Sequence, residues 1–435
     1  MDDILINYET RILVLSISSW NIKKGMNTWP AFLEGHAPER IAHICFRQDV
    51  PNNPVCNNYF VISENKVIKS IIKRNLKTGL TLKRCNENVA LAEELITQKK
   101  RYNKMKKHRN VFTLLGRELL WKLGKWQTKE LEIFVKHFCP DIILYSMEGY
   151  LYFNRVCRYV KKISKVKSIG FFCDDNFTYK QTNSLFNHIL RFFQRKSLKK
   201  LVNNTDGFFA ITPKMKKEAD DFFGIDSVLL SKPCYHIPLV DYSELQFPIK
   251  ILYTGNLGID RDKSLLKVVE AIKRINLNKN YFELNVYTST ELSESVKNLL
   301  SCDFCSISGA ISQDEVLKLQ KEFDVLLFLE AIAGKNVKTA RLSFSTKITD
   351  YFSAGKCIFA VGAKDIAPIE YLKENDCAII ATTEEEIYEQ LKTIVEDTRV
   401  LRKYAINAVE CAKQNHNKNK ILTIFNETIE NTIKK

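Results

Sequence analysis

The sequence predicts an α/β protein with two doubly wound, mostly parallel sheets. Short apolar runs alternate with amphipathic helical segments, and a proline-bearing segment divides this alternation into two series. A length of 435 residues is enough for two domains. The composition, 45% hydrophobic and 27% charged, is typical of a globular protein. No apolar run approaches the ~18 residues that cross a bilayer.

The first series contains five apolar runs that are typical of buried strands. They are residues 11–16, 41–46, 141–145, 168–173 and 207–211. A helix is predicted directly after the last run, because Thr212 and Pro213 combine a capping side chain with a proline at the first helical position.

The second series begins near residue 249. Its predicted strands are residues 251–253, 283–287, 324–329, 357–361 and 377–381. Between the two series, residues 230–248 carry Pro233, Pro238 and Pro248, which predicts an interdomain linker.

Residues 251–265 combine a strand, a glycine-containing loop and a helix. This order brings a helix N-terminus and backbone N–H groups to a bound phosphate, and Arg261 lies where it can form charge-assisted hydrogen bonds to a diphosphate. The alternative for the two glycines is an ordinary tight turn. The candidate binding residues in this stretch are Gly255, Asn256, Leu257, Gly258 and Arg261.

Residues 343–361 predict a short capped helix, a glycine stop and a buried strand. Ser345 or Thr346 can cap the helix, and Gly355 can end it. Lys347 and Asp350 are three residues apart, so they share one helical face. Either they bind a ligand together or they form an ordinary surface ion pair.

Together, the two stretches resemble the donor-binding half of GT-B glycosyltransferases, close to family 4 (the group 1 enzymes of polysaccharide biosynthesis). The resemblance covers about residues 249–397. It implies two Rossmann-like domains facing a central cleft: an acceptor-binding domain over residues 1–235 and a nucleotide-sugar-binding domain over residues 249–400. It also implies that residues 401–435 form a C-terminal helix that packs back toward the N-terminal domain.

The resemblance assigns roles to two residues of the short helix. In the family, a basic residue before this helix contacts the phosphates, and an acidic residue within it binds the ribose hydroxyls; Lys347 and Asp350 occupy these places. The implied donor is a nucleotide-diphosphate sugar, with no further cofactor. We expect fixed cations rather than a metal to stabilise the leaving diphosphate, because no D-x-D motif follows a predicted strand.

The sequence departs from the family at one acidic position. Family members usually carry two glutamates separated by seven residues, and here Asp350 holds the later place while Leu342 holds the earlier one. Glu330, at the end of the run 324–329, is a candidate catalytic carboxylate in its stead, or a plain strand-end charge. We expect a retaining hexosyltransferase-like enzyme, but this departure leaves retention or inversion open.

The N-terminal half offers two further catalytic candidates. Asp174 and Asp175 follow the run 168–173, and active-site groups of open α/β sheets collect at the carboxyl ends of strands. Either aspartate could orient or deprotonate an acceptor hydroxyl, or else cap a helix. The loop after the first strand resembles one that borders the acceptor cleft, with Gly25 and Asn27 as candidates.

Charge and cysteine usage bear on location and partners. The net charge is +16, with basic clusters between Lys66 and Arg109 and between Arg191 and Lys200. These are either solvated helix faces or surfaces for an anionic membrane or acidic acceptor. No nucleic-acid-binding motif is recognisable. The 12 scattered cysteines and the absence of a secretory signal predict a cytoplasmic protein. The basic N-terminal half predicts a peripheral position at the inner face of the plasma membrane.

The leading hypothesis is a glycosyltransferase that moves a sugar from a nucleotide-diphosphate donor to a lipid-linked or polysaccharide acceptor in cell-surface glycan synthesis. A second hypothesis is a nucleotide-sugar 2-epimerase with the same fold, which needs no acceptor. A third is a basic, non-enzymatic scaffold with a degenerate nucleotide pocket, which the leucine at position 342 favours.

Overall fold

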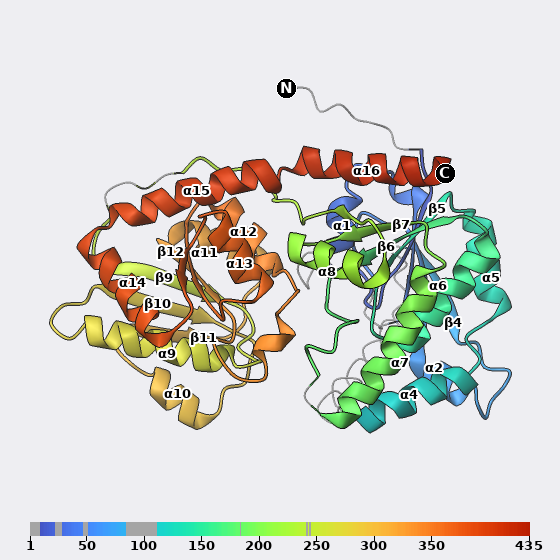
Figure 1. Cartoon of the computed structure of the whole chain (residues 1–435), viewed down its shortest axis with the longest axis horizontal. Helices are drawn as coiled ribbons and strands as arrows, with labels where there is room; N and C mark the ends of the chain where they lie inside the picture. Colours follow the sequence, from blue (N-terminus) through green and yellow to red (C-terminus); the bar gives the residue numbers. More distant parts are fainter. Residues whose placement is uncertain are drawn as a thin grey trace. The chain divides into compact units, whose positions relative to one another are not determined.

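A computed structural model describes residues 9–21, 28–46, 51–83, 111–182, 184–240, 242 and 245–435 (Figure 1). The chain forms two compact units: unit 1 comprises Met1–Leu230 and Leu422–Lys435, and unit 2 comprises Ser231–Ile421. Gly25, Asn27 and the basic residues between Lys99 and Arg109 lie outside the described residues.

Unit 1 contains an eight-stranded sheet in the order β4-β3-β2-β1-β5-β6-β7-β8. All neighbouring strands are parallel except the antiparallel pair β3 and β4. The five predicted runs form β1, β2, β5, β6 and β7, whereas β3, β4 and the two-residue β8 were not predicted. The bounds are β1 Ile12–Leu15, β2 Ile41–Cys45, β3 Asn58–Ile62, β4 Gly79–Lys83, β5 Ile142–Ser146, β6 Lys167–Phe172, β7 Gly207–Ala210 and β8 Val228–Leu229.

The described helices of unit 1 pack against the strands and against one another. The predicted helix after Thr212 is α8; the Thr212 hydroxyl accepts a hydrogen bond from the Met215 N–H at 3.0 Å, and Gly224 ends the helix with a φ of 68°. The bounds are α1 Thr28–Phe32, η2 Pro38–Arg40, α2 Glu64–Lys69, α4 Val111–Leu123, α5 Lys129–Phe138, α6 Leu151–Ser164, α7 Leu185–Val202 and α8 Pro213–Phe223.

Unit 2 contains a six-stranded sheet in which every neighbouring pair is parallel, in the order β11-β10-β9-β12-β13-β14. The five predicted runs are all strands, and β11 at the edge was not predicted. Its residues Cys305–Ser308 are short, polar and mostly exposed, so they lack the apolar signal of a buried strand. The other bounds are β9 Ile249–Thr254, β10 Phe282–Tyr287, β12 Val325–Leu329, β13 Cys357–Val361 and β14 Ile379–Ala381.

Helices pack on this second sheet around a core of buried aliphatic and aromatic side chains. Their bounds are α9 Arg261–Ile275, α10 Glu294–Leu300, α11 Gln313–Glu322, η3 Val337–Thr339, α12 Thr346–Ala354, α13 Ala367–Glu374, α14 Glu384–Glu396 and α15 Arg399–Asn415. The described residues contain no helix with both the length and the apolar character needed to cross a membrane.

The predicted linker, residues 230–248, belongs to unit 2 from Ser231 onward. The Cys234 N–H donates to the His416 carbonyl at 3.0 Å, and the Tyr235 N–H donates to Ser353 Oγ at 3.1 Å. Tyr242 Oη donates to the Asp324 carbonyl at 2.6 Å and accepts from the Cys357 N–H at 2.6 Å. These contacts fasten the segment to unit 2, and the prolines do not prevent them.

Residues 401–435 form parts of two helices rather than one. α15 ends at Asn415 and belongs to unit 2, whereas α16 (Lys418–Lys434) contributes its residues from Leu422 onward to unit 1. In unit 1, the ring of Phe425 stacks between Phe32 and Phe209, with centroid distances of 5.7 Å and 5.8 Å. Each helix therefore buries its own apolar stripe in a different unit.

Candidate nucleotide-binding site

The glycine loop follows the central strand of unit 2 at the carboxyl edge of the sheet. β9 ends at Thr254, and Gly255 has a φ of 140°, a conformation that favours glycine. Ile259 and Asp260 are left-handed, with φ values of 64° and 62°, before α9 begins at Arg261. Ligands of open parallel sheets bind at this edge, so the loop lies where a nucleotide is expected.

Three N–H groups of this loop are bonded inside the protein. Gly255 donates to the Tyr287 carbonyl at 2.9 Å, Leu257 donates to Thr290 Oγ1 at 2.9 Å, and Gly258 donates to Asn256 Oδ1 at 2.6 Å. The side chain of Leu257 is buried in the core. The expectation that the loop offers these N–H groups to a phosphate therefore does not hold in this structure, because neighbouring oxygens already accept from them.

Gly255 instead makes room for Lys347. A Cβ atom on Gly255 would lie 2.0 Å from Lys347 Nζ and 2.5 Å from its Cε, closer than real atoms approach. The ammonium lies 4.6 Å from the centroid of the Tyr253 ring and 3.5 Å from its hydroxyl. The glycine loop and helix α12 therefore contact each other through the side chain of Lys347, which is 92 residues after Gly255 in the sequence.

The charge of Lys347 is destabilised in the free protein. Burial, together with the nearby positive charge of Arg261, lowers the pKa of Lys347 from its ordinary value of 10.5 to about 8. Two cations thus face one region, with Glu330 and Asp350 partly compensating. A bound anion would relieve this repulsion, which is the electrostatic character expected of a diphosphate site.

Arg261 is held by the carboxylate of Glu330. Arg261 donates from Nε to Oε2 at 3.0 Å and from Nη2 to Oε1 at 2.8 Å, a bidentate geometry. Glu330 is buried directly after β12, and its backbone carbonyl accepts from Ser264 Oγ of α9 at 2.8 Å. Both carboxylate oxygens of Glu330 accept hydrogen bonds from Arg261. The carboxylate that was predicted to be catalytic therefore fixes the position of a cation in this structure.

Asp350 pairs with a lysine that sequence reasoning did not single out. Lys232 Nζ lies 3.2 Å from Asp350 Oδ1 and 3.3 Å from the Thr346 carbonyl, and Lys232 is 1% exposed. Burial raises the pKa of Asp350, and Lys232 opposes that shift. Among the described residues, Asp350 forms its ion pair with Lys232 and not with Lys347. The alternative predicted from the sequence, a surface ion pair between Lys347 and Asp350, therefore does not form.

Helix α12 begins and ends close to the predicted residues. Ser345 is the N-terminal cap residue, but its side chain makes no capping hydrogen bond, in contrast to the expectation. Thr346 is the first helical residue, and its carbonyl accepts from Thr349 Oγ1 at 2.9 Å. Gly355 ends the helix with a φ of 69°, as predicted. Leu342 is fully buried, so an apolar contact replaces the carboxylate expected at that position.

The two aspartates of unit 1 have different surroundings. Asp175 is 1% exposed, and its carboxylate accepts hydrogen bonds from both the N–H (2.9 Å) and the hydroxyl of Thr178. Asp174 is exposed at the carboxyl end of β6. Asp175 therefore stabilises the loop, whereas Asp174 is the carboxylate that a solvent-borne group can reach.

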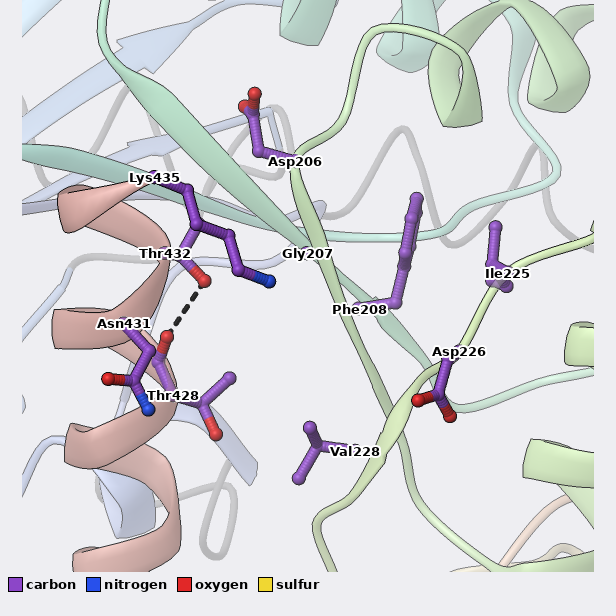
Figure 2. Close-up of a pocket in the computed structure, with 10 residues that line it drawn as sticks. All are labelled: Asp206, Gly207, Phe208, Ile225, Asp226, Val228, Thr428, Asn431, Thr432 and Lys435. Carbon is purple, nitrogen blue, oxygen red and sulfur yellow. Dashed lines mark hydrogen bonds between the residues drawn. The ribbon is translucent and has the colours of Figure 1, made fainter.

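Two cavities lie within the separate units. A cavity of about 480 Å³ in unit 2 is lined by residues at the carboxyl ends of β10 and β11, including Thr290, the acceptor for Leu257. A cavity of about 330 Å³ in unit 1 lies between α16 and the amino ends of β7 and β8 (Figure 2). The second contains no predicted site residue and is at the opposite edge of the sheet from Asp174.

Within the described ranges, no group of three or more His, Cys, Asp or Glu side chains is arranged to hold a metal ion.

Comparisons with known proteins place the fold. No protein-family profile and no curated protein matches the chain. Among solved structures, HepE from Anabaena in complex with UDP and glucose aligns with a TM-score of 0.61 and 12% identity, over 97% of this chain and 100% of that one. Sucrose-phosphate synthase from Thermosynechococcus elongatus aligns with a TM-score of 0.57 and 10% identity, over 97% and 99%. TarM aligns with a TM-score of 0.51 and 10% identity, over 69% of this chain and 57% of its own.

The chain is an α/β protein with two parallel Rossmann-like sheets. Its structural neighbours are glycosyltransferases of the GT-B fold, and the chain has that fold. The predicted fold class is therefore confirmed.

Proposed function

We propose that this protein is a glycosyltransferase that moves a hexose from a nucleotide-diphosphate donor onto a lipid-linked or polysaccharide acceptor, without an obligatory metal. The observation that carries the proposal is the cation pair Arg261 and Lys347 beside Gly255. Both lie at the carboxyl edge of the unit 2 sheet, the edge at which parallel sheets bind nucleotides.

The cation pair suits the chemistry of the leaving group. When the sugar departs, negative charge grows on the β-phosphate and must be stabilised by preorganised charges. Glu330 fixes Arg261 by two hydrogen bonds, and Gly255 lets Lys347 approach from the other side. The 480 Å³ cavity, which shares Thr290 with the glycine loop, is the proposed room for a nucleoside. Asp350 is the proposed acceptor for the ribose hydroxyls.

Asp174 is the proposed group that orients or deprotonates the acceptor hydroxyl, because it is exposed at the carboxyl end of β6. Glu330 is proposed as a positioning residue for Arg261. The proposal also includes transfer with retention of the anomeric configuration, a cytoplasmic location and peripheral association with the membrane. HepE, a neighbour in fold, has been solved with UDP and with UDP-glucose, which supports a nucleotide-sugar donor.

Calorimetric titration with UDP, GDP and ADP, with and without EDTA, tests the proposal. We expect one nucleotide to bind with micromolar affinity in both conditions, and Lys347→Ala to weaken it by ~10²-fold, the usual cost of removing one preorganised charge. Lys318→Ala, an exposed lysine on α11, is the matched control. Binding of no nucleotide would favour the scaffold hypothesis, and loss of binding in EDTA would refute metal independence.

A second assay separates transfer from epimerisation. The donor that matches the bound nucleotide is incubated without acceptor, and its sugar is analysed. A transferase leaves the donor intact or hydrolyses it slowly, whereas a 2-epimerase converts the sugar to its epimer. Appearance of the epimer would replace the transferase proposal with the epimerase one.

A further inference from the structure

Helices α4 and α7 of unit 1 expose an unusual number of large apolar side chains. On α7 these lie in the first turns, with exposures from 42% for Ile189 to 74% for Leu185. Phe112 of α4 is 65% exposed, and its ring lies 5.0 Å from that of Phe186. We call this set the α4–α7 face; its apolar members are Phe112, Leu119, Leu123, Leu185, Phe186, Ile189, Phe192 and Phe193.

The exposed side of α7 changes from apolar to basic along the helix. Phe192 and Phe193 are followed one turn later by Lys196, whose ammonium lies 4.5 Å from the Phe192 ring centroid. Lys199 and Lys200 are exposed in the last turn. The sequence of α7 contains no acidic residue, so the charged residues that follow the apolar part within this helix are all basic.

The acidic residues of the neighbouring helices are neutralised. Glu64 of α2 pairs with Arg117, and Glu118 of α4 pairs with Arg155 at 3.5 Å. Figure 1 shows α2, α4 and the start of α7 at the same end of unit 1, in agreement with the contacts between these helices. Among the described residues of α2, α4 and α7, the exposed lysines of α7 therefore give this face a positive border, which suits a partner that is both apolar and anionic.

We propose that the α4–α7 face docks on an anionic lipid surface, with its phenylalanines at the level of the acyl boundary and its lysines at the lipid phosphates. Exposed aromatic and aliphatic side chains next to lysines are the composition of peripheral membrane-binding helices. A contact between two copies is disfavoured, because α7 contains no acidic residue to pair with the lysines of the other copy.

The helix α7, which carries part of this face, also holds the loop of Asp174 through residues on another of its sides. Arg191 of α7 donates to the Asp175 carbonyl at 2.9 Å, and Arg195 donates to the Phe177 carbonyl at 2.7 Å. His188 of α7 stacks on Tyr179 at 5.5 Å. Docking would therefore hold this loop near the membrane surface, where a lipid-linked acceptor is found; this part of the inference rests on the proposed function.

Flotation of the full-length protein with vesicles tests the inference. Vesicles of equal parts phosphatidylcholine and phosphatidylglycerol are compared with vesicles of phosphatidylcholine alone. We expect binding to the anionic vesicles, weakened by added salt because the charges are exposed. Phe192→Ser/Phe193→Ser should weaken binding at least ~10-fold, and Lys196→Gln/Lys199→Gln about 25-fold at low salt, from roughly fivefold for each lysine.

The controls are matched for exposure and chemistry. Leu277→Ser, a 77% exposed leucine of unit 2, and Lys318→Gln should bind vesicles like the parent protein. Circular dichroism checks that each variant is folded. Absence of vesicle binding by the parent protein, or unchanged binding by the phenylalanine variant, would overturn the inference.

Two further measurements separate membrane docking from dimerisation and from the proposed function. Light scattering that shows a dimer of the parent protein and a monomer of Phe192→Ser/Phe193→Ser would assign the face to a second copy and overturn the inference. Nucleotide titration of the same variants should match the parent protein. If vesicles bind but no nucleotide does, the membrane surface stands and the proposed function fails.

Discussion

The Gly255–Lys347 region of unit 2 and the Asp174–α7 region of unit 1 both follow strand ends at the carboxyl edge of a parallel sheet, yet they manage charge in opposite ways. In unit 2, Arg261 and Asp350 are each paired with a partner from a distant segment, and Lys347 fits against a glycine. In unit 1, Asp174 is exposed, and the lysines of α7 are exposed on the same helix as the apolar side chains of the α4–α7 face.

This difference indicates two kinds of recognition. A diphosphate is stabilised best by charges that are fixed before it arrives and partly shielded from water. A lipid surface is recognised by exposed apolar groups and mobile cations. If this comparison is correct, substitutions in unit 2 should change stability and catalysis together, whereas substitutions in unit 1 should separate the two.

The largest effect is expected for Gly255→Ala. The added methyl group would meet Lys347 Nζ, and a φ of 140° strains any residue with a Cβ. We expect nucleotide affinity to fall more than ~10²-fold and the free energy of unfolding to fall by ~1–3 kcal/mol. Calorimetry and chemical denaturation measure the two quantities.

The matched control is Gly116→Ala, where a Cβ would meet no atom within 4 Å. In the double variant Gly255→Ala/Lys347→Ala, the loss of stability should be smaller than in Gly255→Ala, because the clash is gone. Parent-like affinity in Gly255→Ala would show that Lys347 does not need this close approach.

A smaller effect is expected at the Arg261–Glu330 pair. Arg261→Ala should lower kcat/KM by ~10²-fold and leave Glu330 buried without its partner. We expect the free energy of unfolding to fall by about 2 kcal/mol, less than for a fully buried pair, because the Arg261 side chain is 22% exposed. Glu330→Ala should lower kcat/KM by about 10-fold through misplacement of Arg261.

A double-mutant cycle sharpens this prediction. Arg261→Ala/Glu330→Ala should recover most of the lost stability while kcat/KM stays at the level of Arg261→Ala. A glutamate that contacts the sugar directly would behave differently, since its loss would lower kcat further in the double variant.

Nucleotide binding should depend on pH through Lys347. Because its pKa in the free protein is lowered to about 8, the ammonium is charged below that pH and neutral above it. Nucleotide affinity should therefore fall by up to about tenfold per pH unit above pH 8. Calorimetry across this range should show the fall in the parent protein, and Lys347→Ala should lose it. A parent profile that stays flat to pH 10 would contradict the assignment of Lys347 to the phosphates.

The smallest effects are expected at the two aspartates of unit 1. Asp175→Ala should lower the free energy of unfolding by ~1–2 kcal/mol, because Thr178 loses a buried acceptor. Asp174→Ala should change it by less than ~0.5 kcal/mol, as for an exposed residue, but lower kcat about tenfold or more. Equal stability losses in both variants would remove the distinction between a loop-stabilising and an acceptor-facing aspartate.

Local features of both units were predictable. The ten strands were recognised as apolar runs, and the start of α8 and the end of α12 follow from Thr212 and Gly355. Apolar runs, capping residues and helix-ending glycines depend on residues that are close in the sequence, so they can be recognised without knowledge of the fold. The strands β3, β4, β8 and β11 were not predicted. β8 and β11 are short and exposed, whereas β3 is a buried run that the sequence analysis did not single out.

The sequence by itself determined the two α/β series, the residue types at strand ends and the identity of the candidate phosphate-binding cations. Only the tertiary structure decided which charges meet: Glu330 with Arg261 across 69 residues, and Lys232 with Asp350 across 118. It also decided that the missing side chain of Gly255 leaves space for Lys347, and that the side chain of Ser345 makes no capping hydrogen bond. The physical reason is that ion pairs and close approaches depend on distances in space, which strand order and helix packing set and which local sequence patterns do not contain.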